Sequence, residues 1–318
     1  MKDIAAPVAK EAILAELTEE KLLRKTNKGA NEIYVITYHD SPNIMHEIGR
    51  LREITFREAG GGTGKDLDID QYDTQENPYK QLIVWDPDAQ EILGGYRYIL
   101  CDGLPTDENG EVKLATARLF HFSEKFLSEF MPHTLELGRS FVQPAYQSSK
   151  AGAKALFALD NLWDGLGALI VDHPEIKYFF GKVTMYTHFN VKARNLILYF
   201  FDKYFKDHDY LVYPKKPMEV DMDRNEMAQI FNGKTYNEDY RILTQKVREL
   251  GENIPPLINA YMNLSPSMKT FGTILNDRFG DVEETGIIVT IKDIYDAKRD
   301  RHIETYIKDK GDSFPEIK

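Results

Sequence analysis

The chain has 318 residues, and its 40 Lys and Arg against 51 Asp and Glu give a formal net charge of −11. Hydrophobic residues make up 42% of the sequence, which is typical of a folded globular protein and excludes wholesale disorder. The net acidity argues against a general nucleic-acid-binding protein, and the single cysteine, Cys101, excludes a disulfide framework and a cysteine-based zinc site.

The periodicity of the apolar residues predicts helices and strands that alternate along most of the chain. Helices are expected over 11–25, from Ser41 onward, over 149–171, over 191–205 and near 239–250. Strands are expected over 31–38, 81–86, 92–100, 134–142, 178–186 and 287–291. Gly29 is placed to end the first helix, and Ser41 followed by Pro42 is typical of the start of the second.

This order of elements predicts an α/β protein with a mixed central sheet flanked by helices. Strand–helix alternation in the second half favours parallel pairing there, whereas the turn at Asp86-Pro87-Asp88 favours an antiparallel hairpin before it. The chain divides into an N-terminal helical arm over 1–30, a core over 31–205, a charged insertion over 206–253, a C-terminal part of the core domain over 254–307 and a tail over 308–318.

The N-terminal residues do not resemble a targeting signal. Residues 1–10 lack the apolar core of a secretory peptide, and no run reaches the ~20 apolar residues that a membrane span needs. We therefore expect a cytoplasmic protein, with peripheral contact at the inner face of the membrane left open.

Three segments resemble known motifs but fail at required positions. Residues 60–65 lack the first Gly and the final Ser or Thr of a phosphate-binding loop. The aspartates of 66–70 lack the later Gly and Glu of a calcium loop, and 138–142 lacks the second Gly of a nucleophile elbow. No His-Glu-x-x-His pair occurs. We therefore expect no NTPase, no serine or zinc hydrolase and no metal site.

Charged residues stand out in four segments whose surroundings are apolar or aromatic. They are Arg52 with Phe56, Asp70 with Asp73, Arg97 alone, and Glu136 with Arg139. Charges in the strands of a covered sheet are costly unless they are paired. A regular strand would place Glu136 and Arg139 on opposite faces, but a bulge at Gly138 would turn both to one face. The set is either an internal ion-pair network that holds the sheet or a cleft that binds a substrate.

In this order and spacing, the residues resemble one branch of the Gcn5-related N-acyltransferase superfamily. The resemblance is carried by Arg52 and Phe56, Asp68–Asp73, Gly94–Arg97, Glu136–Gln147 and the late Ile254–Tyr261. That branch contains the ornithine-lipid N-acyltransferases that use acyl carrier protein, often labelled hemolysin-like, and the glycine N-acyltransferases of Bacteroidota. Acyl-homoserine-lactone synthases are more distant relatives. The resemblance implies the Gcn5-related fold for the core over 31–205.

The resemblance also implies a reaction. A long-chain, 3-hydroxylated acyl group would move directly from acyl carrier protein to the amine of a small amino acid, glycine or ornithine, as the first step of an amino-acid-containing membrane lipid. The co-substrate would be a phosphopantetheine thioester, or acyl-coenzyme A, with no tightly bound cofactor, no metal and no nucleic-acid partner. Open alternatives are a non-catalytic acyl- or lipid-binding protein on this fold, an acyl-homoserine-lactone-type synthase and a coenzyme A-dependent acetyltransferase.

Roles for the acceptor side of the site follow from the same resemblance. The catalytic set is Glu136, Arg139 and Arg97, with Glu136 as general base and one arginine as a fork for the acceptor carboxylate. A backbone N–H near Phe141 and Val142 would stabilise the oxyanion. The remaining substrate-binding residues are Arg52, Phe56, Asp70 and Asp73, of which the aspartates would orient the arginines or bind the ammonium.

Roles for the donor side come from the segment that follows. It resembles the superfamily's pyrophosphate loop, with Lys150 in place of the middle Gly, and its binding residues would be Gln147, Ser148, Ser149, Lys150 and Gly152. An acidic carrier protein would dock on a basic patch made of Lys150, Lys154, Lys182, Lys192 and Arg194. Apolar residues over 156–163 and 196–201 are candidates for an acyl-chain trough, although plain core packing is the favoured interpretation for each of them.

Overall fold

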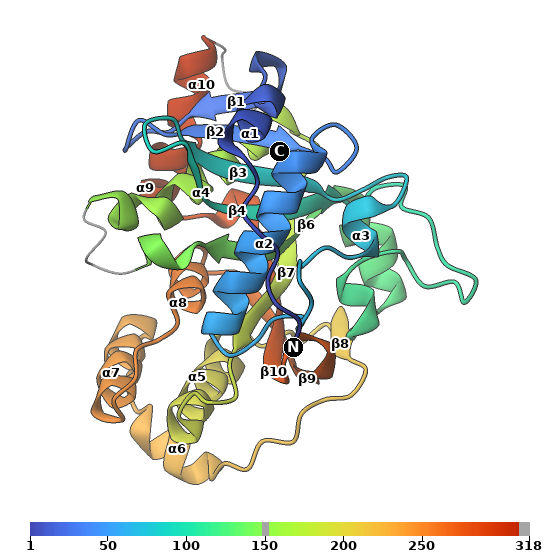
Figure 1. Cartoon of the computed structure of the whole chain (residues 1–318). Coiled ribbons are helices and arrows are strands. Elements are labelled where there is room, and N and C mark those ends of the chain that lie inside the picture. The colour runs from blue at the N-terminus through green and yellow to red at the C-terminus, as the bar shows by residue number, and fades with distance from the viewer. Residues whose placement is uncertain (148–152, 312–318) are drawn as a thin grey trace.

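A computed structural model describes residues 1–147 and 153–311, in which eight strands form one sheet with helices on both faces (Figure 1). The strand order is β1-β2-β3-β4-β6-β7-β10-β9. The strands are β1 (Leu22–Lys25), β2 (Glu32–Ile36), β3 (Lys80–Asp86), β4 (Glu91–Leu100), β6 (Thr134–Val142), β7 (Tyr178–Met185), β9 (Lys269–Asn276) and β10 (Val282–Thr290). The expected α/β class with a mixed central sheet is confirmed.

Helices cover the two faces of this sheet because its strands alternate apolar side chains. Ile83 and Trp85 of β3 pack with α2 (Pro42–Glu58), whereas Leu82 and Val84 pack in the core cluster of α4 (Ala153–Asp172) and α5 (Val191–Tyr204). The other helices are α1 (Lys10–Glu16), α3 (Gln71–Thr74), α6 (Arg224–Ile230), α7 (Tyr236–Glu249), α8 (Pro256–Met262), α9 (Asp296–His302) and α10 (Glu304–Lys310). Over the described ranges, no helix has the length and apolarity to span a membrane.

The sheet divides where β6 meets β7. These two strands pair in parallel, over Thr134–Glu136 with Tyr178–Phe180. Beyond that point β6 continues beside β4 as far as Val142, and β7 continues beside β10 as far as Met185. The later residues of β6 and β7 are therefore not paired with each other, and this break in the pairing is called the opening below.

The helix expected over 11–25 is wrong in its second half. Helix α1 ends at Glu16, and Leu22–Lys25 forms edge strand β1, which pairs antiparallel with β2. Gly29, at φ +88°, lies in the β1–β2 turn, so residues 1–30 are not only a helical arm. Ser41 does precede α2, but its hydroxyl donates to Asp40 and does not cap the helix.

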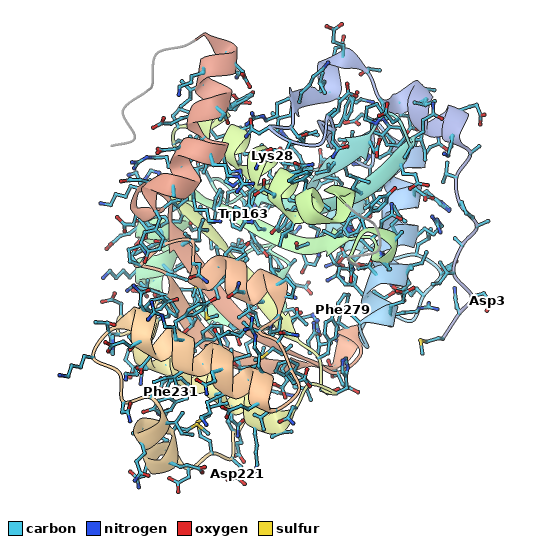
Figure 2. All side chains as sticks on the ribbon, turned by 90° about the vertical axis from the view of Figure 1, so that its left-hand side faces the viewer. Asp3, Lys28, Trp163, Asp221, Phe231 and Phe279 are labelled. Carbon is cyan, nitrogen blue, oxygen red and sulfur yellow. The ribbon has the colours of Figure 1, made fainter. Side chains whose placement is uncertain are left out.

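The C-terminal half is more regular than expected. Strand β9 was not predicted, because a bulge at Gly272 (φ +84°) breaks its alternation. The insertion contains β8 (Val212–Pro214), which pairs with β5 (Phe120–Phe122) of the core. Figure 2 shows Asp221 and Phe231 of the insertion at the opposite end of the molecule from Lys28. The expected tail is ordered at its start, since α10 extends to Lys310.

Candidate active site

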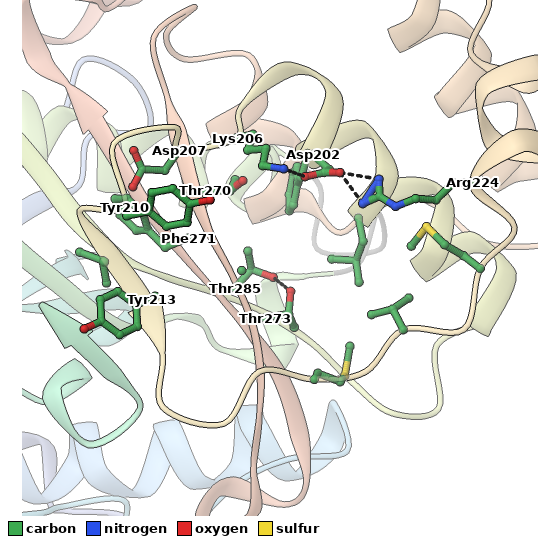
Figure 3. A pocket seen from close by; sticks show the side chains of 17 residues that line it. Asp202, Lys206, Asp207, Tyr210, Tyr213, Arg224, Thr270, Phe271, Thr273 and Thr285 are labelled. Atoms are coloured by element: carbon green, nitrogen blue, oxygen red, sulfur yellow. Dashed lines mark hydrogen bonds and ion pairs between the residues drawn. The ribbon is translucent and has the colours of Figure 1, made fainter. Parts of the chain in front are cut away.

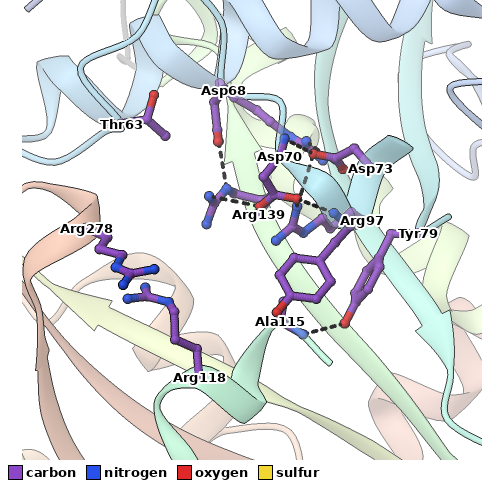
Figure 4. A network of polar contacts seen from close by, with 12 residues as sticks. Thr63, Asp68, Asp70, Asp73, Tyr79, Arg97, Ala115, Arg118, Arg139 and Arg278 are labelled. Carbon is purple, nitrogen blue, oxygen red and sulfur yellow. Dashed lines mark hydrogen bonds and ion pairs between the residues drawn. The ribbon is translucent and has the colours of Figure 1, made fainter. Parts of the chain in front are cut away.

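Three arginines and three aspartates form a buried ion-pair network on the α2 face of the sheet (Figure 4). This Arg–Asp network consists of Arg52, Arg97, Arg139, Asp68, Asp70 and Asp73. Arg97 Nη1 lies 2.9 Å from Asp70 Oδ1 and 3.1 Å from Asp73 Oδ2. Arg139 Nε lies 2.7 Å from Asp68 Oδ2, and Arg52 Nη1 lies 3.4 Å from Asp73 Oδ1. The network therefore contains at least one residue from each of the four charged segments singled out in the sequence.

The aspartates are fixed by the local structure of α3. Asp70 is the N-cap residue, and its carboxylate accepts from the Tyr72 N–H at 2.9 Å. Asp73 completes a capping box, because its carboxylate accepts from the Asp70 N–H at 3.1 Å. Burial raises the pKa of Asp73, but the charges of Arg97 and Arg52 outweigh burial and lower that pKa to about 2.

A bulge in β6 brings Arg139 to this network. Gly95 of β4 pairs with Phe141, whereas Arg97 pairs with Gly138, so β6 contains one extra residue between these pairs. Arg139 has φ +49°, in the left-handed region, and its side chain turns to the α2 face. Gly94 permits the close approach, since a Cβ there would collide with the Phe141 carbonyl oxygen. The expected bulge is present, directly after Gly138.

Two aromatic rings pack against the Arg139 side chain, one directly and one through the first ring. Its guanidinium lies 4.3 Å from the ring centroid of Phe279, and that ring contacts Phe56 edge-on at 5.0 Å between centroids. Phe56 is buried in the core under α2. It therefore supports the position of Phe279, and through it the position of Arg139.

Glu136 lies on the same face, in a separate buried environment. Its Oε2 accepts from the Tyr79 hydroxyl at 2.8 Å, and its Oε1 accepts from the Thr116 N–H at 3.2 Å. The Ala115 N–H donates to the Tyr79 hydroxyl in turn, at 2.9 Å. Burial raises the pKa of Glu136 to about 7, although the Tyr79 hydrogen bond and Arg97 oppose the rise. A carboxyl group with such a pKa can exchange a proton near neutral pH.

A second polar network lies across the opening, on β7, β9 and β10. Lys182 forms an ion pair with Glu284, whose Oε2 accepts from Asn276 Nδ2 at 3.0 Å. Asn276 Oδ1 accepts from Arg118 Nη2 at 2.6 Å. Burial lowers the pKa of Lys182, and Arg139 and Arg97 lower it further, while Glu284 opposes the shift. The two networks therefore lie near each other.

Several residues of this site were not found by sequence reasoning. Tyr79, Arg118, Glu284 and Phe279 come from segments whose patterns resemble ordinary loops and strands. Asp68 stood within the recognised Asp68–Asp73 segment without a role. Its position close to Asp70 and Asp73 was the one sequence signal that could have assigned it to the same network.

The basic docking patch is contradicted at two positions. Lys182 is largely buried and paired with Glu284, and Arg194 Nη1 lies 3.1 Å from Glu283 Oε1, so neither side chain is free to meet a partner. Lys192 is exposed on α5. Lys150 and the side chain of Lys154 lie outside the described residues.

The other donor-side expectations are covered only in part. Phe141 is buried beside α2, and Val142 is half-buried at the end of β6. Gln147 is exposed, and its side-chain amide donates to the Val142 carbonyl at 2.5 Å. The remaining loop residues, Ser148, Ser149, Lys150 and Gly152, lie outside the described residues.

A cavity of about 410 Å³ lies beside α5, on the face of the sheet opposite Glu284 (Figure 3). Thr285 of β10 lies at its floor, and its hydroxyl is hydrogen-bonded to the hydroxyl of Thr273 on β9, with 2.8 Å between the two oxygens. Its apolar lining includes Leu198, Phe201, Met218, Val220 and Met222. Two residues of the expected acyl trough therefore line a cavity. Others, Leu162, Leu196, Ile197 and Phe200, are buried in the core cluster.

Two further observations concern the chemistry available. Over the described ranges, no three His, Cys, Asp or Glu side chains are grouped to hold a metal ion. Cys101 is buried, and burial raises the pKa of its thiol, which disfavours the thiolate that nucleophilic attack would need.

Comparison with known proteins adds independent findings. Residues 51–156 match a family described as an acetyltransferase (GNAT) domain. The chain is 60% identical over 308 residues to a glycine N(alpha)-acyltransferase of Phocaeicola vulgatus, covering 97% of this chain and 94% of that protein. It is 56% identical over 313 residues to a glycine N(alpha)-acyltransferase of Bacteroides thetaiotaomicron, covering 98% and 93%. No solved structure matches the chain significantly.

Proposed function

Because this chain is an acyltransferase that belongs to the Gcn5-related N-acyltransferase (GNAT) superfamily, we propose that its acceptor is the amine of glycine. The identity of 60% over 97% of the chain to a glycine N(alpha)-acyltransferase is the observation that carries this proposal. Of the two acceptors expected from the sequence, it favours glycine over ornithine. It also argues against the non-catalytic lipid-binding alternative.

The donor is proposed as a long-chain, 3-hydroxylated acyl group on acyl carrier protein. Lys150 replaces the middle Gly of the superfamily's pyrophosphate loop, and this change suits a single phosphopantetheine phosphate. The product would be an N-acylglycine, the first intermediate of a glycine-containing membrane lipid. Acyl-coenzyme A is the competing donor that the test must separate.

The proposed chemistry is direct transfer between the two bound substrates. Glu136 would take a proton from the glycine ammonium, and the free amine would attack the thioester carbon, so that a C–N bond forms and the C–S bond breaks. The thiol leaves with a proton. The pKa of about 7 and the position of Glu136 beside the β6 bulge support this role.

We place the acyl chain in the cavity beside α5. Its volume of about 410 Å³ is in the range of small-molecule sites, and apolar side chains from α5 and the insertion line it together with the charged Asp202, Lys206, Asp207 and Arg224. The thioester would lie at the opening between β6 and β7, with the acceptor on the α2 face and the chain on the α5 face. The insertion would then serve to close the chain-binding cavity, through Met218, Val220 and Met222.

A carrier-thiol release assay tests the proposal. Purified protein is mixed with 3-hydroxypalmitoyl acyl carrier protein or 3-hydroxypalmitoyl-coenzyme A, and with glycine, ornithine or homoserine, followed by mass spectrometry of the lipid. We expect thiol release that depends on glycine and on the carrier-bound donor, with N-acylglycine as the product. Release that depends on ornithine, or only on coenzyme A, would overturn the corresponding half of the proposal.

A further inference from the structure

The Arg–Asp network is neutral in formal charge, so it offers no net positive charge to a substrate carboxylate. Its three arginines, Arg52, Arg97 and Arg139, are balanced by the three aspartates Asp68, Asp70 and Asp73. Arg97 contacts two of these carboxylates, and so does Arg139. Another carboxylate placed against them would give the site a net negative charge. The carboxylate fork must therefore be sought elsewhere.

Two other arginines face the same space from the opposite side. Figure 4 shows the guanidinium groups of Arg118 and Arg278 directed toward each other, across from Arg139. Arg118 ends the short 3-10 turn Thr116–Arg118, and Arg278 lies in the turn Asp277–Phe279. Arg278 is exposed, and in the described ranges its side chain has no hydrogen bond or ion pair.

The charges around this pair leave one cation unbalanced. Lys182, Arg118 and Arg278 carry three positive charges, and Glu284 and Asp277 carry two negative ones, so 3 − 2 = 1. Asp277 balances weakly, because it lies 3.9 Å from Arg118 and is 80% exposed. Burial and the neighbouring Arg278 lower the pKa of Arg118. An anion between the two guanidinium groups would relieve this repulsion.

The Arg118 guanidinium and the turn that carries Arg278 are held in place before any anion binds. Asn276 Oδ1 accepts from Arg118 Nη2 at 2.6 Å, and it accepts from the Arg278 backbone N–H at 3.3 Å. Asn276 also donates to the buried Glu284. The next residue of the turn, Phe279, is fixed under Arg139. Such preorganisation is what a specific binding site requires.

We propose that Arg118 and Arg278 bind the carboxylate of the amino-acid acceptor, and so select an α-amino acid over a simple amine. This inference rests on the proposed function. Thr116, two residues before Arg118, donates its backbone N–H to Glu136. A carboxylate held at Arg118 would therefore direct the amine of a short amino acid toward the proposed base.

An oxyanion in this position could also be the phosphate of the donor. We commit to the carboxylate because the pair lies on the same face as Glu136 and the Arg–Asp network. The loop proposed for the phosphate leads into α4, which covers the other face. The two sources make opposite kinetic predictions.

The test uses full-length Arg278→Gln and Arg118→Gln, which remove charge but keep a hydrogen-bonding side chain. The control is Arg299→Gln, since the side chains of Arg299 and Arg118 are equally exposed, at 34%. We expect each site variant to raise the KM for glycine about tenfold or more, with the KM for the acyl donor unchanged, because each variant loses a charge-assisted hydrogen bond to the carboxylate. Arg278→Lys should restore part of the loss.

Glycinamide gives the readout that a merely structural role would not move. Wild type should prefer glycine to glycinamide, and the two Gln variants should lose about tenfold or more of that preference. An unchanged preference and an unchanged glycine KM would overturn the inference, and so would a rise confined to the donor KM. If wild type uses another amino acid, the proposed glycine acceptor is wrong, but the role of the arginine pair is still tested. The same comparison is then made with that amino acid and its amide.

Discussion

Glu136 is the residue whose protonation we expect to control the rate. Its pKa of about 7 predicts that kcat/KM rises with pH to about 7 and then levels, because the ionised carboxylate accepts the proton. Glu136→Gln should lower kcat by about 100-fold or more, within the usual range for loss of a general base. The exposed Glu129→Gln is the control. Full activity of a folded Glu136→Gln protein would remove Glu136 as the base.

A substitution at Tyr79 tests whether the Glu136 carboxylate has a catalytic role or only a structural one. Its hydroxyl donates to Glu136 and thereby lowers the pKa of that group, against the larger effect of burial. Tyr79→Phe should therefore shift the rise of kcat/KM to higher pH. A change in rate with no shift of the pH profile would mean that Glu136 does not titrate in the reaction.

At the scale of elements, the Arg–Asp network joins α2, α3, β4 and β6, which do not all meet through apolar contacts. Asp73 is its central member, since it contacts both Arg52 and Arg97 with no exposed surface. Removing one partner of a buried ion pair leaves an uncompensated charge, which costs about 3–5 kcal/mol. Asp73→Asn should therefore lower the melting temperature strongly, whereas Asp66→Asn, at an exposed aspartate, should not.

The pH dependence of that stabilisation has a definite sign. The arginines lower the pKa of Asp73 to about 2, below its ordinary value of 3.8, so the carboxylate stabilises the fold above about 3.8. This contribution is lost as the pH falls toward 2. The difference in unfolding free energy between wild type and Asp73→Asn should thus shrink between about pH 4 and pH 2. A difference that stays constant with pH would mean that Asp73→Asn destabilises the fold through altered packing and not through the lost charge.

The same elements show which parts of the site could be predicted from sequence. Glu136 and Arg139 were recognisable because charge inside an apolar strand is rare, and Gly138 suggested the bulge that turns Arg139 to the face of Glu136. Arg118 and Arg278 could not be found in this way, because both lie in polar turns where an arginine is ordinary. Arg278 lies in the turn between β9 and β10, and it reaches Arg118 because these two strands complete the sheet beside β7. No local sequence pattern predicts that placement.

At the scale of the whole molecule, the proposed site would use both faces of the sheet, with the thioester placed where the pairing of β6 and β7 ends. The proposed acceptor site uses the α2 face, and the proposed acyl cavity uses the α5 face together with the insertion. In this arrangement the insertion would cover the acyl chain, through Met218, Val220 and Met222. The arrangement also separates the two specificities, because acceptor choice and chain length would be set by different residues.

Val220 tests that separation, because it lines the cavity from the insertion and is only half-buried. Val220→Trp fills the cavity, so activity with a sixteen-carbon donor should fall about tenfold or more, while activity with a four-carbon donor is kept. This loss corresponds to about 1.4 kcal/mol of binding energy. Val220→Ala should leave the long donor accepted, and the KM for glycine should stay constant in both variants. Equal loss with both donors, in a protein that melts normally, would mean that the chain lies elsewhere.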